Sequence, residues 1–574
     1  MNDRDKTLLD RYVPITDWLR DYRGSTFRKD LRAGLTVGIL LIPQSMAYAL
    51  LAGLPPVYGL YASIVPLAIY AVFGTSRQLG IGPVAIVSIL VASGIGNLAE
   101  PATGRYIELV LAVALLVGIT QFLMGAFRLG FLMNFLSKPV LSGFTSAAAF
   151  IIGFSQLGNL TGIDIQRSKY VAAVLYDAVS NIGLLHWPTL IIGLGCILFI
   201  LVLNRKWPRI PAQLLAVVLS TAAVWIFGLH ETGVSIVGSV TSGYPAPELP
   251  ALTGLPWWKI APTVLAVAFL GFTQSIALAK AMVRRNPDYQ VDSNQELFSI
   301  GLANMVGSVF HAYPVAGSFS RTAVNDENRA KTGVSLLISA SMVFLTVLFL
   351  TPLIYYLPQA ALAAIIITAV PGLIEIEEVQ FLWKVRRRDL AIMLITFGST
   401  LALGILEGIG IGVLISLGIV IHRSSYPNIV MLGRLPNTDH YRDLERHPEG
   451  LTQTNTIIIR IDAALYFANI PYMKEKLEEL EAESGKNLNQ VIIDAIGIND
   501  VDSSALHALK ELVTEYQSRD IDVLFTGVKG PVRDIFKRSG LDDVIGPEQF
   551  YLDIAHAVDS LEKESEEKSH LVQQ

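Results

Sequence analysis

Long runs of apolar residues recur between about Ala33 and His422, and they constrain the fold more than any other feature. Runs of about 18 or more apolar residues are typical of helices that span a membrane. The chain is 52% hydrophobic and 16% charged, whereas soluble globular domains carry about 25% charged residues. We therefore expect an α-helical polytopic membrane protein with about fourteen transmembrane segments, some of them half-spanning.

The sequence divides into regions of different composition. A charged N-terminal segment precedes the apolar region, and a polar segment with alternating strand and helix patterns follows it. Alternation of this kind is typical of a small α/β domain with helices packed on a sheet. The predicted regions are an N-terminal cytoplasmic segment (1–32), a transmembrane domain (33–425), a linker (426–450), an α/β domain (451–563) and a disordered tail (564–574).

Basic residues are concentrated in alternate connections between the apolar segments. The positive-inside rule places such connections on the cytoplasmic side, which predicts a multi-pass protein of the cell (inner) membrane with both termini in the cytoplasm. The basic residues of these connections are Arg77, Arg128, Lys138, Arg205, Lys206, Arg209, Arg284, Arg285, Lys384, Arg386, Arg387 and Arg388.

The apolar region contains a weak internal repeat. The hexapeptide that begins at Gln44 resembles the one that begins at Gln274, an offset of 274 − 44 = 230 residues. Pro83-Val84-Ala85 resembles Pro314-Val315-Ala316 at 314 − 83 = 231 residues. An odd number of segments fits this offset, so the copies, at about 33–229 and 261–425, should be antiparallel. Inverted repeats with interrupted helices are a transporter design.

Two interrupted segments, 79–97 and 313–331, suggest where a ligand would bind. A helix that begins inside the bilayer leaves N–H groups unpaired, and these groups and the helix dipole favour an anion. Antiparallel copies would bring the helix N-termini near Pro83 and near Gly317-Ser318 face to face at the midplane. We therefore predict a site for a small anion between these two ends.

At these residues the chain resembles the sulfate permease (SulP) family, the bacterial relatives of solute carrier family twenty-six. The stretch 34–66 is similar to the family's first-helix signature, and 74–77, 82–85, 294–297 and 317–325 follow its pattern. The α/β region resembles a STAS domain. The resemblance implies seven-plus-seven inverted repeats, a core domain that moves against a gate domain as an elevator, and a homodimer.

The resemblance also implies the residues of the anion site. In the family the anion lies between the third and tenth helices, which match the segments beginning near Val84 and Ser320, and first-helix residues line it. The predicted substrate-binding residues are Gln44, Tyr48, Pro83, Val84, Ala85, Gln274, Ser318, Phe319, Ser320 and Arg321.

Gln274 departs from the family pattern. Many bacterial members carry a glutamate at this position of the eighth helix, in a pattern like F-x-E-S-I-A, where this chain reads Phe272-Thr273-Gln274-Ser275-Ile276-Ala277. Glutamine is isosteric with glutamate but neither takes up a proton nor carries a charge. Proton symport through this position is therefore disfavoured, and exchange or uncoupled transport is favoured.

Several of these residues also have purely structural interpretations. Arg321 would extend to the cytoplasmic face and pair with Asp326 or Glu327, and Gln44 and Gln274 would link helices. Tyr48 would pack as an ordinary aromatic residue, and Ser318 and Ser320 would cap a helix. Asp292 and Glu296, near a predicted helix start, are interpreted as structural.

In the soluble region, Asp502-Ser503-Ser504 opens a predicted helix after a strand. Asp or Ser is a favourable N-cap there. In free-standing STAS proteins a serine of this loop is phosphorylated, so Ser503 and Ser504 are candidate regulatory residues, and the domain is a candidate binding site for a cytoplasmic protein.

The sequence also excludes several functions. One cysteine, Cys196, cannot form an internal disulfide or a cysteine metal site, and no P-loop, catalytic triad or metal cluster occurs. We expect no enzyme activity, no cofactor and no nucleic-acid partner. The sequence favours a secondary transporter of sulfate, bicarbonate, chloride, nitrate or a dicarboxylate in the lipid bilayer, and leaves open an anion channel of the same fold or a membrane sensor that signals through the STAS domain.

Overall fold

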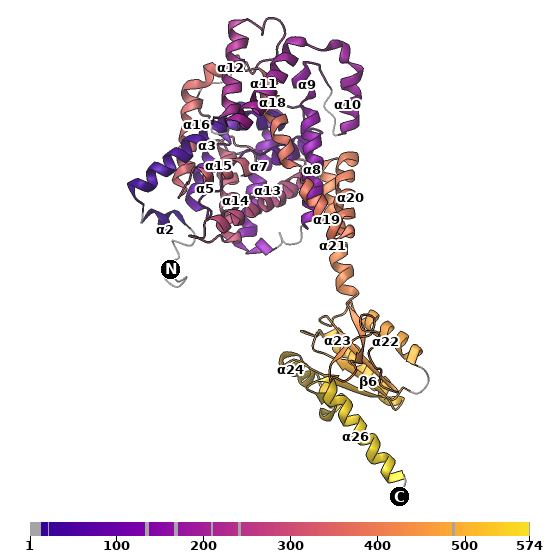
Figure 1. The fold of residues 1–574 in the computed structure, drawn as a ribbon. Helices are drawn as coiled ribbons and strands as arrows, with labels where there is room; N and C mark the ends of the chain where they lie inside the picture. The colour runs from indigo at the N-terminus through magenta and orange to yellow at the C-terminus, as the bar shows by residue number, and fades with distance from the viewer. Residues whose placement is uncertain are drawn as a thin grey trace. The chain divides into compact units, whose positions relative to one another are not determined.

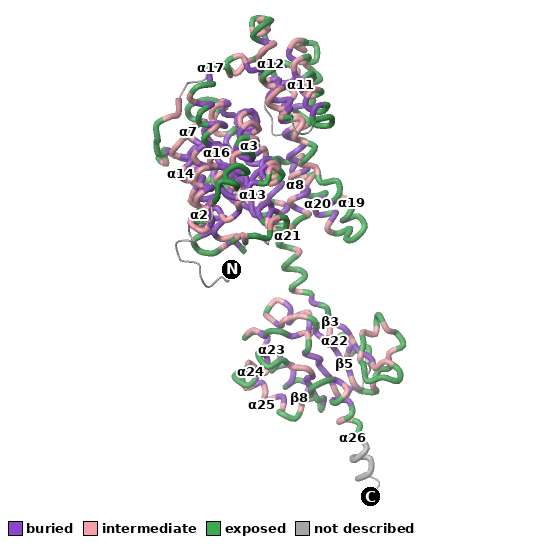
Figure 2. The backbone as a smooth tube through the Cα atoms, turned by 60° about the vertical axis from the view of Figure 1, so that its left-hand side comes forward, coloured by how far each residue is buried: buried purple, intermediate pink, exposed green. Residues whose placement is uncertain are grey.

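The computed structural model describes residues 13–20, 22–131, 137–165, 170–207, 210–238, 243–484 and 488–572. They form two compact units, Met1–Ser416 and Leu417–Gln574 (Figure 1). The first unit is helical and the second contains a β-sheet, as predicted. Figure 2 shows the buried residues gathered in the interior of each unit, whereas α19 (Ile376–Val385) is mostly exposed.

Among the described residues, eight helices are long and apolar enough to cross a membrane. Four shorter apolar helices accompany them: Val57–Phe73, Ala85–Ile95, Val171–Ser180 and Ala212–Ile226. The membrane protein predicted from the apolar runs is confirmed, while the count of about fourteen segments stays a prediction. The helices used below are α3 (Gly24–Leu51), α6 (Ala85–Ile95), α7 (Gly104–Ala126), α8 (Lys138–Ser155), α9 (Leu157–Thr161), α10 (Val171–Ser180), α11 (Trp187–Lys206), α13 (Trp257–Arg285), α14 (Ser293–Val309), α15 (Phe319–Glu327), α18 (Gln359–Ala369) and α21 (Ile405–Ser425).

A two-stranded antiparallel ribbon joins the two halves of the membrane unit. Ile81 of β1 (Ile81–Gly82) pairs with Gly317 of β2 (Ala316–Gly317), and Gly82 pairs with Ala316. The short helix α6 begins directly after β1, and α15 begins directly after β2. The two half-helices therefore start from the same ribbon, each after one of two strands that run in opposite directions.

The repeat register differs from the one read from the sequence. The helix N-caps are Val84 for α6 and Ser318 for α15, an offset of 318 − 84 = 234 residues. The Pro83-Val84-Ala85 match placed the offset at 231, because Pro314 precedes its strand whereas Pro83 follows its strand. The sequence located the two segments correctly, but aligned them three residues out of structural register.

Close helix packing surrounds the ribbon. Helices α7 and α14 approach at glycines: a Cβ on Gly118 would lie 2.5 Å from the Met305 nitrogen, and one on Gly301 would lie 2.3 Å from the Phe122 nitrogen. Real Cβ atoms do not approach backbone so closely, so only glycine allows this contact. Small residues at helix crossings are the usual means of close packing in membranes.

Two buried carboxylates hold the loops on either side of the half-helices. Glu296 accepts hydrogen bonds from the Tyr70 hydroxyl (2.7 Å) and from the backbone nitrogens of Thr75 (2.8 Å) and Ser76 (3.1 Å). Asp30 accepts from the backbone nitrogens of Lys331 (2.7 Å) and Thr332 (3.2 Å). Each carboxylate thereby satisfies buried donors of a loop distant in sequence.

The structural interpretation of Asp292 and Glu296 agrees with these contacts, although the two residues act differently. Asp292 caps α14 by accepting from the backbone nitrogens of Asn294 (2.8 Å) and Gln295 (3.3 Å). Glu296 lies one turn further along α14 and accepts hydrogen bonds from the loop that contains Thr75 and Ser76. The sequence could indicate the cap, because capping is local, but it could not indicate the partner of Glu296.

The second unit contains a six-stranded sheet in the order β4-β3-β5-β6-β7-β8. One face packs against α22 (Ile470–Ser484), α23 (Ser503–Ser518), α24 (Gly530–Ser539) and α25 (Leu541–Ile545), and the other face packs against α26 (Ile554–Val572). The strands are β3 (Ile429–Arg434), β4 (Tyr441–Asp443), β5 (Thr456–Ile461), β6 (Gln490–Asp494), β7 (Asp522–Thr526) and β8 (Phe550–Tyr551).

The structure corrects two boundaries of this unit. Residues 426–450, predicted as a linker, contain β3 and β4, and β3 pairs with β5 in the sheet. The sheet therefore begins before the predicted start at residue 451. Residues 564–574 were predicted as a disordered tail; α26 continues to Val572, and residues 573–574 lie outside the described residues. A charged sequence with suitable spacing can extend a helix whose first turns are packed.

Replacing Glu296 with Ala should destabilise the membrane unit strongly. The donors of Tyr70, Thr75 and Ser76 would remain buried without an acceptor, so we expect a loss of about 3 kcal/mol or more in the free energy of unfolding. Thermal unfolding of the full chain in detergent measures this loss. The exposed residue Glu377 supplies the control variant, Glu377→Ala, and equal melting temperatures for the two variants would contradict the role given to Glu296.

Candidate functional site

Four elements meet at the ribbon and carry most of the predicted site residues. Gln44 and Tyr48 lie one turn apart on α3, and Gln274 lies on α13. Val84 and Ala85 begin α6, and Ser318, Ser320 and Arg321 begin α15. Neither Val84 nor Ser318 makes a side-chain capping bond, so the first N–H groups of both half-helices are not satisfied by a cap.

Arg321 is the centre of this group. Its side chain is 1% exposed, and its Nη1 donates to Gln44 Oε1 at 3.2 Å. Its Nε and Nη2 are buried without a hydrogen-bond partner. Gly82 lies beside it, with no side chain to fill the space: a Cβ there would be 3.3 Å from Nη2. The structure thus leaves one edge of a buried guanidinium unoccupied.

The structural interpretation of Arg321 is wrong. Asp326 pairs instead with Asn286, whose Nδ2 lies 2.7 Å from Asp326 Oδ1, and with Arg285, whose Nη1 lies 3.5 Å from Asp326 Oδ2. Among the described residues, no carboxylate forms an ion pair with Arg321. A buried cation without a counter-charge is costly, so the predicted anion site at Arg321 stays a prediction that these contacts do not oppose.

Gln44 connects Arg321 to the serines of α15. Its Nε2 donates to Ser320 Oγ at 3.3 Å, while its Oε1 accepts from Arg321. Ser320 Oγ lies 3.3 Å from Ser318 Oγ. Tyr48 is 7% exposed and interacts with both Gln44 and Arg321. The structure brings these predicted residues together across the two repeats.

Gln274 on α13 contacts strand β2 of the ribbon. Its Nε2 donates to the Gly317 carbonyl at 3.0 Å, and its Oε1 is buried without a hydrogen-bond partner. The neighbouring Ser275 hydroxyl accepts from the Gly317 nitrogen at 2.7 Å. The Gly317 carbonyl requires a donor, which an amide supplies and an ionised carboxylate does not.

The remaining predicted residues are placed differently. Pro83 and Val84 are buried between β1 and α6 and contribute backbone geometry. Phe319 is 70% exposed, so its ring lies outside the buried polar group around Arg321. The prediction for Phe319 came from its place between Ser318 and Ser320, and side chains at successive helix positions point in different directions.

The sequence missed Tyr313, which precedes β2. Tyr313 is 1% exposed, and its hydroxyl lies 3.1 Å from Ser88 Oγ on α6. Its position directly before Pro314 of the repeat was the available signal, but a tyrosine there could equally have been core packing.

Comparison with known proteins agrees with this arrangement. The model of the sulfate permease family matches residues 27–396, which is more than half of the chain. The chain belongs to the sulfate permease family. A STAS domain model matches residues 447–557, so the soluble unit is a STAS domain, as the sequence indicated.

Relatives and solved structures of this family resemble the chain over most of its length. Sulfate transporter 4.1, chloroplastic, of Arabidopsis thaliana is 42% identical over 96% of this chain and 82% of its own length. High affinity sulfate transporter 2 of Stylosanthes hamata is 35% identical over 95% and 85%. The structure of murine Slc26a9, an anion transporter in the inward-facing state, matches with a TM-score of 0.90 at 25% identity over 97% and 96%.

The candidate regulatory serines lie at the start of α23 in the STAS domain. Asp502 caps this helix by accepting from the Ala505 nitrogen at 2.7 Å, and it also accepts from the Phe467 nitrogen at 3.0 Å. Ser503 and Ser504 are exposed. The aspartate therefore forms the predicted cap, which leaves both serine hydroxyls accessible, and their phosphorylation stays a prediction.

Replacing Gln44 with Leu should weaken anion uptake without unfolding the protein. Leucine cannot hold Nη1 of Arg321 or the Ser320 hydroxyl, so we expect the KM for uptake to rise about tenfold. Gln121 is the matched control, because it is equally buried but bonds to Ala268 and Asn304 away from the site. Gln121→Leu should lower the melting temperature and leave KM unchanged. If Gln121→Leu raised KM and Gln44→Leu did not, Gln44 would not belong to the site.

Proposed function

We propose that this chain carries small anions across a membrane by alternating access, with the anion bound at Arg321 between the N-termini of α6 and α15. The observation that carries the proposal is the fully buried guanidinium of Arg321. Two of its nitrogens have no hydrogen-bond partner, and no carboxylate of the described residues forms an ion pair with it. Membership of the sulfate permease family and the names of its relatives support anion transport.

The free edge of Arg321 supports an oxyanion as the substrate. Because Nη1 is held by Gln44, the unoccupied nitrogens are Nε and Nη2, which lie side by side along one edge of a guanidinium. Two parallel N–H groups match two oxygens of one anion in a bidentate pair. Sulfate, bicarbonate, nitrate and carboxylates offer such a pair of oxygens, whereas chloride offers a single centre. Sulfate leads among them, because the similar proteins are sulfate transporters by name.

Gln274 supports exchange or uncoupled transport. Its amide donates to Gly317 much as a protonated carboxyl would, but it cannot release a proton during the cycle. The position is therefore fixed in one charge state, and proton symport through it is disfavoured. We propose that sodium coupling through this position is disfavoured as well, because a neutral amide attracts a cation less than a carboxylate does.

The remaining parts of the proposal concern assembly and orientation. We propose an elevator-type movement of a core domain against a gate domain, in a homodimer with both termini in the cytoplasm. The basic connections that follow α7, α11 and α13 support this orientation. We also propose that a cytoplasmic protein binds the STAS domain at the exposed surface around Ser503 and Ser504.

Arg321→Ala should abolish uptake of every anion, because it removes the charge of the site. Arg321→Lys keeps the charge but presents ammonium donors from one point rather than a fork. We therefore expect Arg321→Lys to lose about tenfold in kcat/KM for sulfate while chloride flux changes little. Radiolabelled flux in proteoliposomes measures both ions.

The exposed Arg284 provides the control, and Arg284→Lys should behave as the unmodified protein. Full uptake by Arg321→Ala would overturn the proposed site. Equal losses of sulfate and chloride in Arg321→Lys would leave the site standing but refute the role of the fork. Large single-channel currents in planar bilayers would replace the carrier with a channel.

Gln274→Glu should make uptake depend on pH. When protonated, the new carboxyl can donate to Gly317 as the amide does; when ionised, it faces that carbonyl and repels the anion. Uptake should therefore be greatest at low pH and fall as pH rises through the titration of the new group. The control is Gln359→Glu on α18, away from the site, for which the pH profile should match the unmodified protein. A flat profile in Gln274→Glu would exclude Gln274 from the site.

A further inference from the structure

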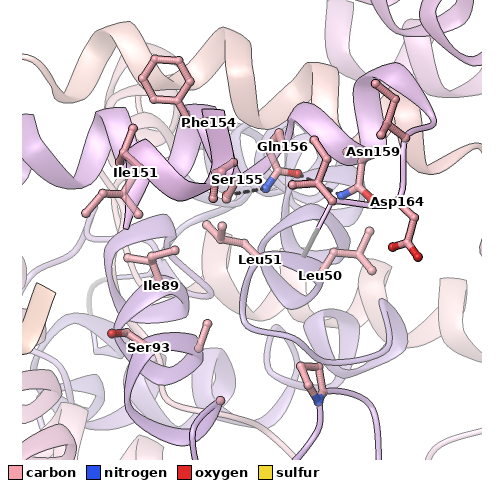
Figure 3. A pocket seen from close by; sticks show the side chains of 18 of the residues that line it. Leu50, Leu51, Ile89, Ser93, Ile151, Phe154, Ser155, Gln156, Asn159 and Asp164 are labelled. Atoms are coloured by element: carbon pink, nitrogen blue, oxygen red, sulfur yellow. Dashed lines mark hydrogen bonds between the residues drawn. The ribbon is translucent and has the colours of Figure 1, made fainter. Parts of the chain in front are cut away.

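A cavity of about 540 Å³ lies beyond the candidate site, at the end of α3 that carries Leu51 (Figure 3). None of the predicted anion-binding residues lines it. Its lining includes Leu51, one turn after Tyr48 on α3, and Ile89, one turn after Ala85 on α6. The cavity and the anion site therefore share two helices but are separate spaces.

The cavity is bounded by two groups of helices. Leu50, Leu51, Ile89 and Ser93 come from α3 and α6, which also carry the anion site. The opposite wall comes from α8 to α11 and from α21, which carry none of the predicted site residues. Under the proposed mechanism these groups belong to the core and the gate, so the cavity must change shape when one moves against the other.

One wall carries a row of polar side chains. The chain turns at Gln156 between α8 and α9, and Gln156 Nε2 donates to Ser155 Oγ at 3.0 Å. Asn159 Nδ2 donates to Gln156 Oε1 at 3.4 Å. Figure 3 shows these three side chains in sequence, with Asp164 beyond Asn159 and apolar residues opposite. The cavity thus has one apolar side and one side with hydrogen-bonding groups.

The charge of the lining distinguishes this cavity from the anion site. Among the described residues that line it, no arginine or lysine occurs, and Asp164 is the only charged side chain. Asp164 is exposed, and its side chain forms no hydrogen bond or ion pair with the residues that the structure describes. Along the described lining an anion would meet a carboxylate and no counter-charge, whereas an ammonium or hydroxyl group would find an acceptor.

We propose that this cavity is a second binding site, for an uncharged or cationic amphiphile, and that its occupant stops transport by holding core and gate in one arrangement. Its volume lies in the range of about 300–1,000 Å³ that small-molecule sites occupy, and its mixed lining is typical of them. The inhibitory part rests on the proposed transport function; the binding part does not.

Three rigid probes of one shape test the site: 1-aminoadamantane, 1-adamantanol and adamantane-1-carboxylate. We expect the amine and the alcohol to raise the melting temperature of the detergent-purified full chain, and the carboxylate to raise it less at equal concentration. This measurement does not depend on transport. No stabilisation by the amine or the alcohol would overturn the proposed site, even if the protein transports sulfate.

Sulfate uptake in proteoliposomes tests the inhibitory role. The amine should lower kcat at unchanged KM, because it binds apart from the anion. Competition with sulfate would place the probe at Arg321 and refute the second site as the cause of inhibition. Stabilisation by the probes together with no sulfate flux at all would retain the second site and count against the proposed function instead.

Two variants locate the probe. Asp164→Asn should weaken binding of the amine about threefold to fivefold, as expected for an exposed charge pair, and leave the alcohol unaffected. Glu231, exposed and outside the lining, supplies the control Glu231→Gln. Ser93→Phe should fill the cavity and abolish binding of both probes at a melting temperature close to that of the unmodified protein. Unchanged binding in Asp164→Asn and in Ser93→Phe would refute the assignment.

Discussion

The structure of the membrane unit depends on the pairing of β1 with β2. This pairing brings two helix N-termini to one place inside an apolar domain, where water cannot satisfy their N–H groups. Arg321 adds a full positive charge, and no carboxylate of the described residues forms an ion pair with it. Each feature alone would be costly in an apolar interior, and the anion of the proposed function would remove that cost. In that proposal the backbone contributes to anion binding as much as any side chain does.

The surrounding contacts keep this arrangement rigid. Glu296 and Asp30 bind the loops that lead to α6 and away from α15, and α7 and α14 pack at glycines without room for adjustment. The loop before β1 and the loop after α15 are thus each held by a carboxylate. The elevator movement that we propose needs a rigid support of this kind, since a flexible core would lose the alignment of Gln44 with Arg321 and Ser320.

The sequence predicted the fold because its strongest signals are periodic or local. The apolar runs, the interrupted segments and the Asp502 cap each depend on neighbouring residues, and all agree with the structure. Signals that depend on distant partners failed. Arg321 could not be separated from an arginine paired with Asp326 until Asp326 was seen with Arg285 and Asn286. The strands within 426–450 were missed because their short, polar-flanked runs resemble a connection until the pairing with β5 is known.

The pairing of β1 with β2 uses backbone groups, and the half-helix N–H groups are backbone as well. These backbone N–H groups keep their partial positive charge whatever side chains stand at Tyr48, Gln274 or Ser320, so long as the ribbon forms. Under the proposed function, substitutions at those positions would change the preferred anion or the coupling ion and leave the scaffold in place. Gly82 is different, because its φ of +144° is strained for any other residue and a Cβ there would lie 3.3 Å from Arg321 Nη2. A single exchange at Gly82 would therefore act on the scaffold itself.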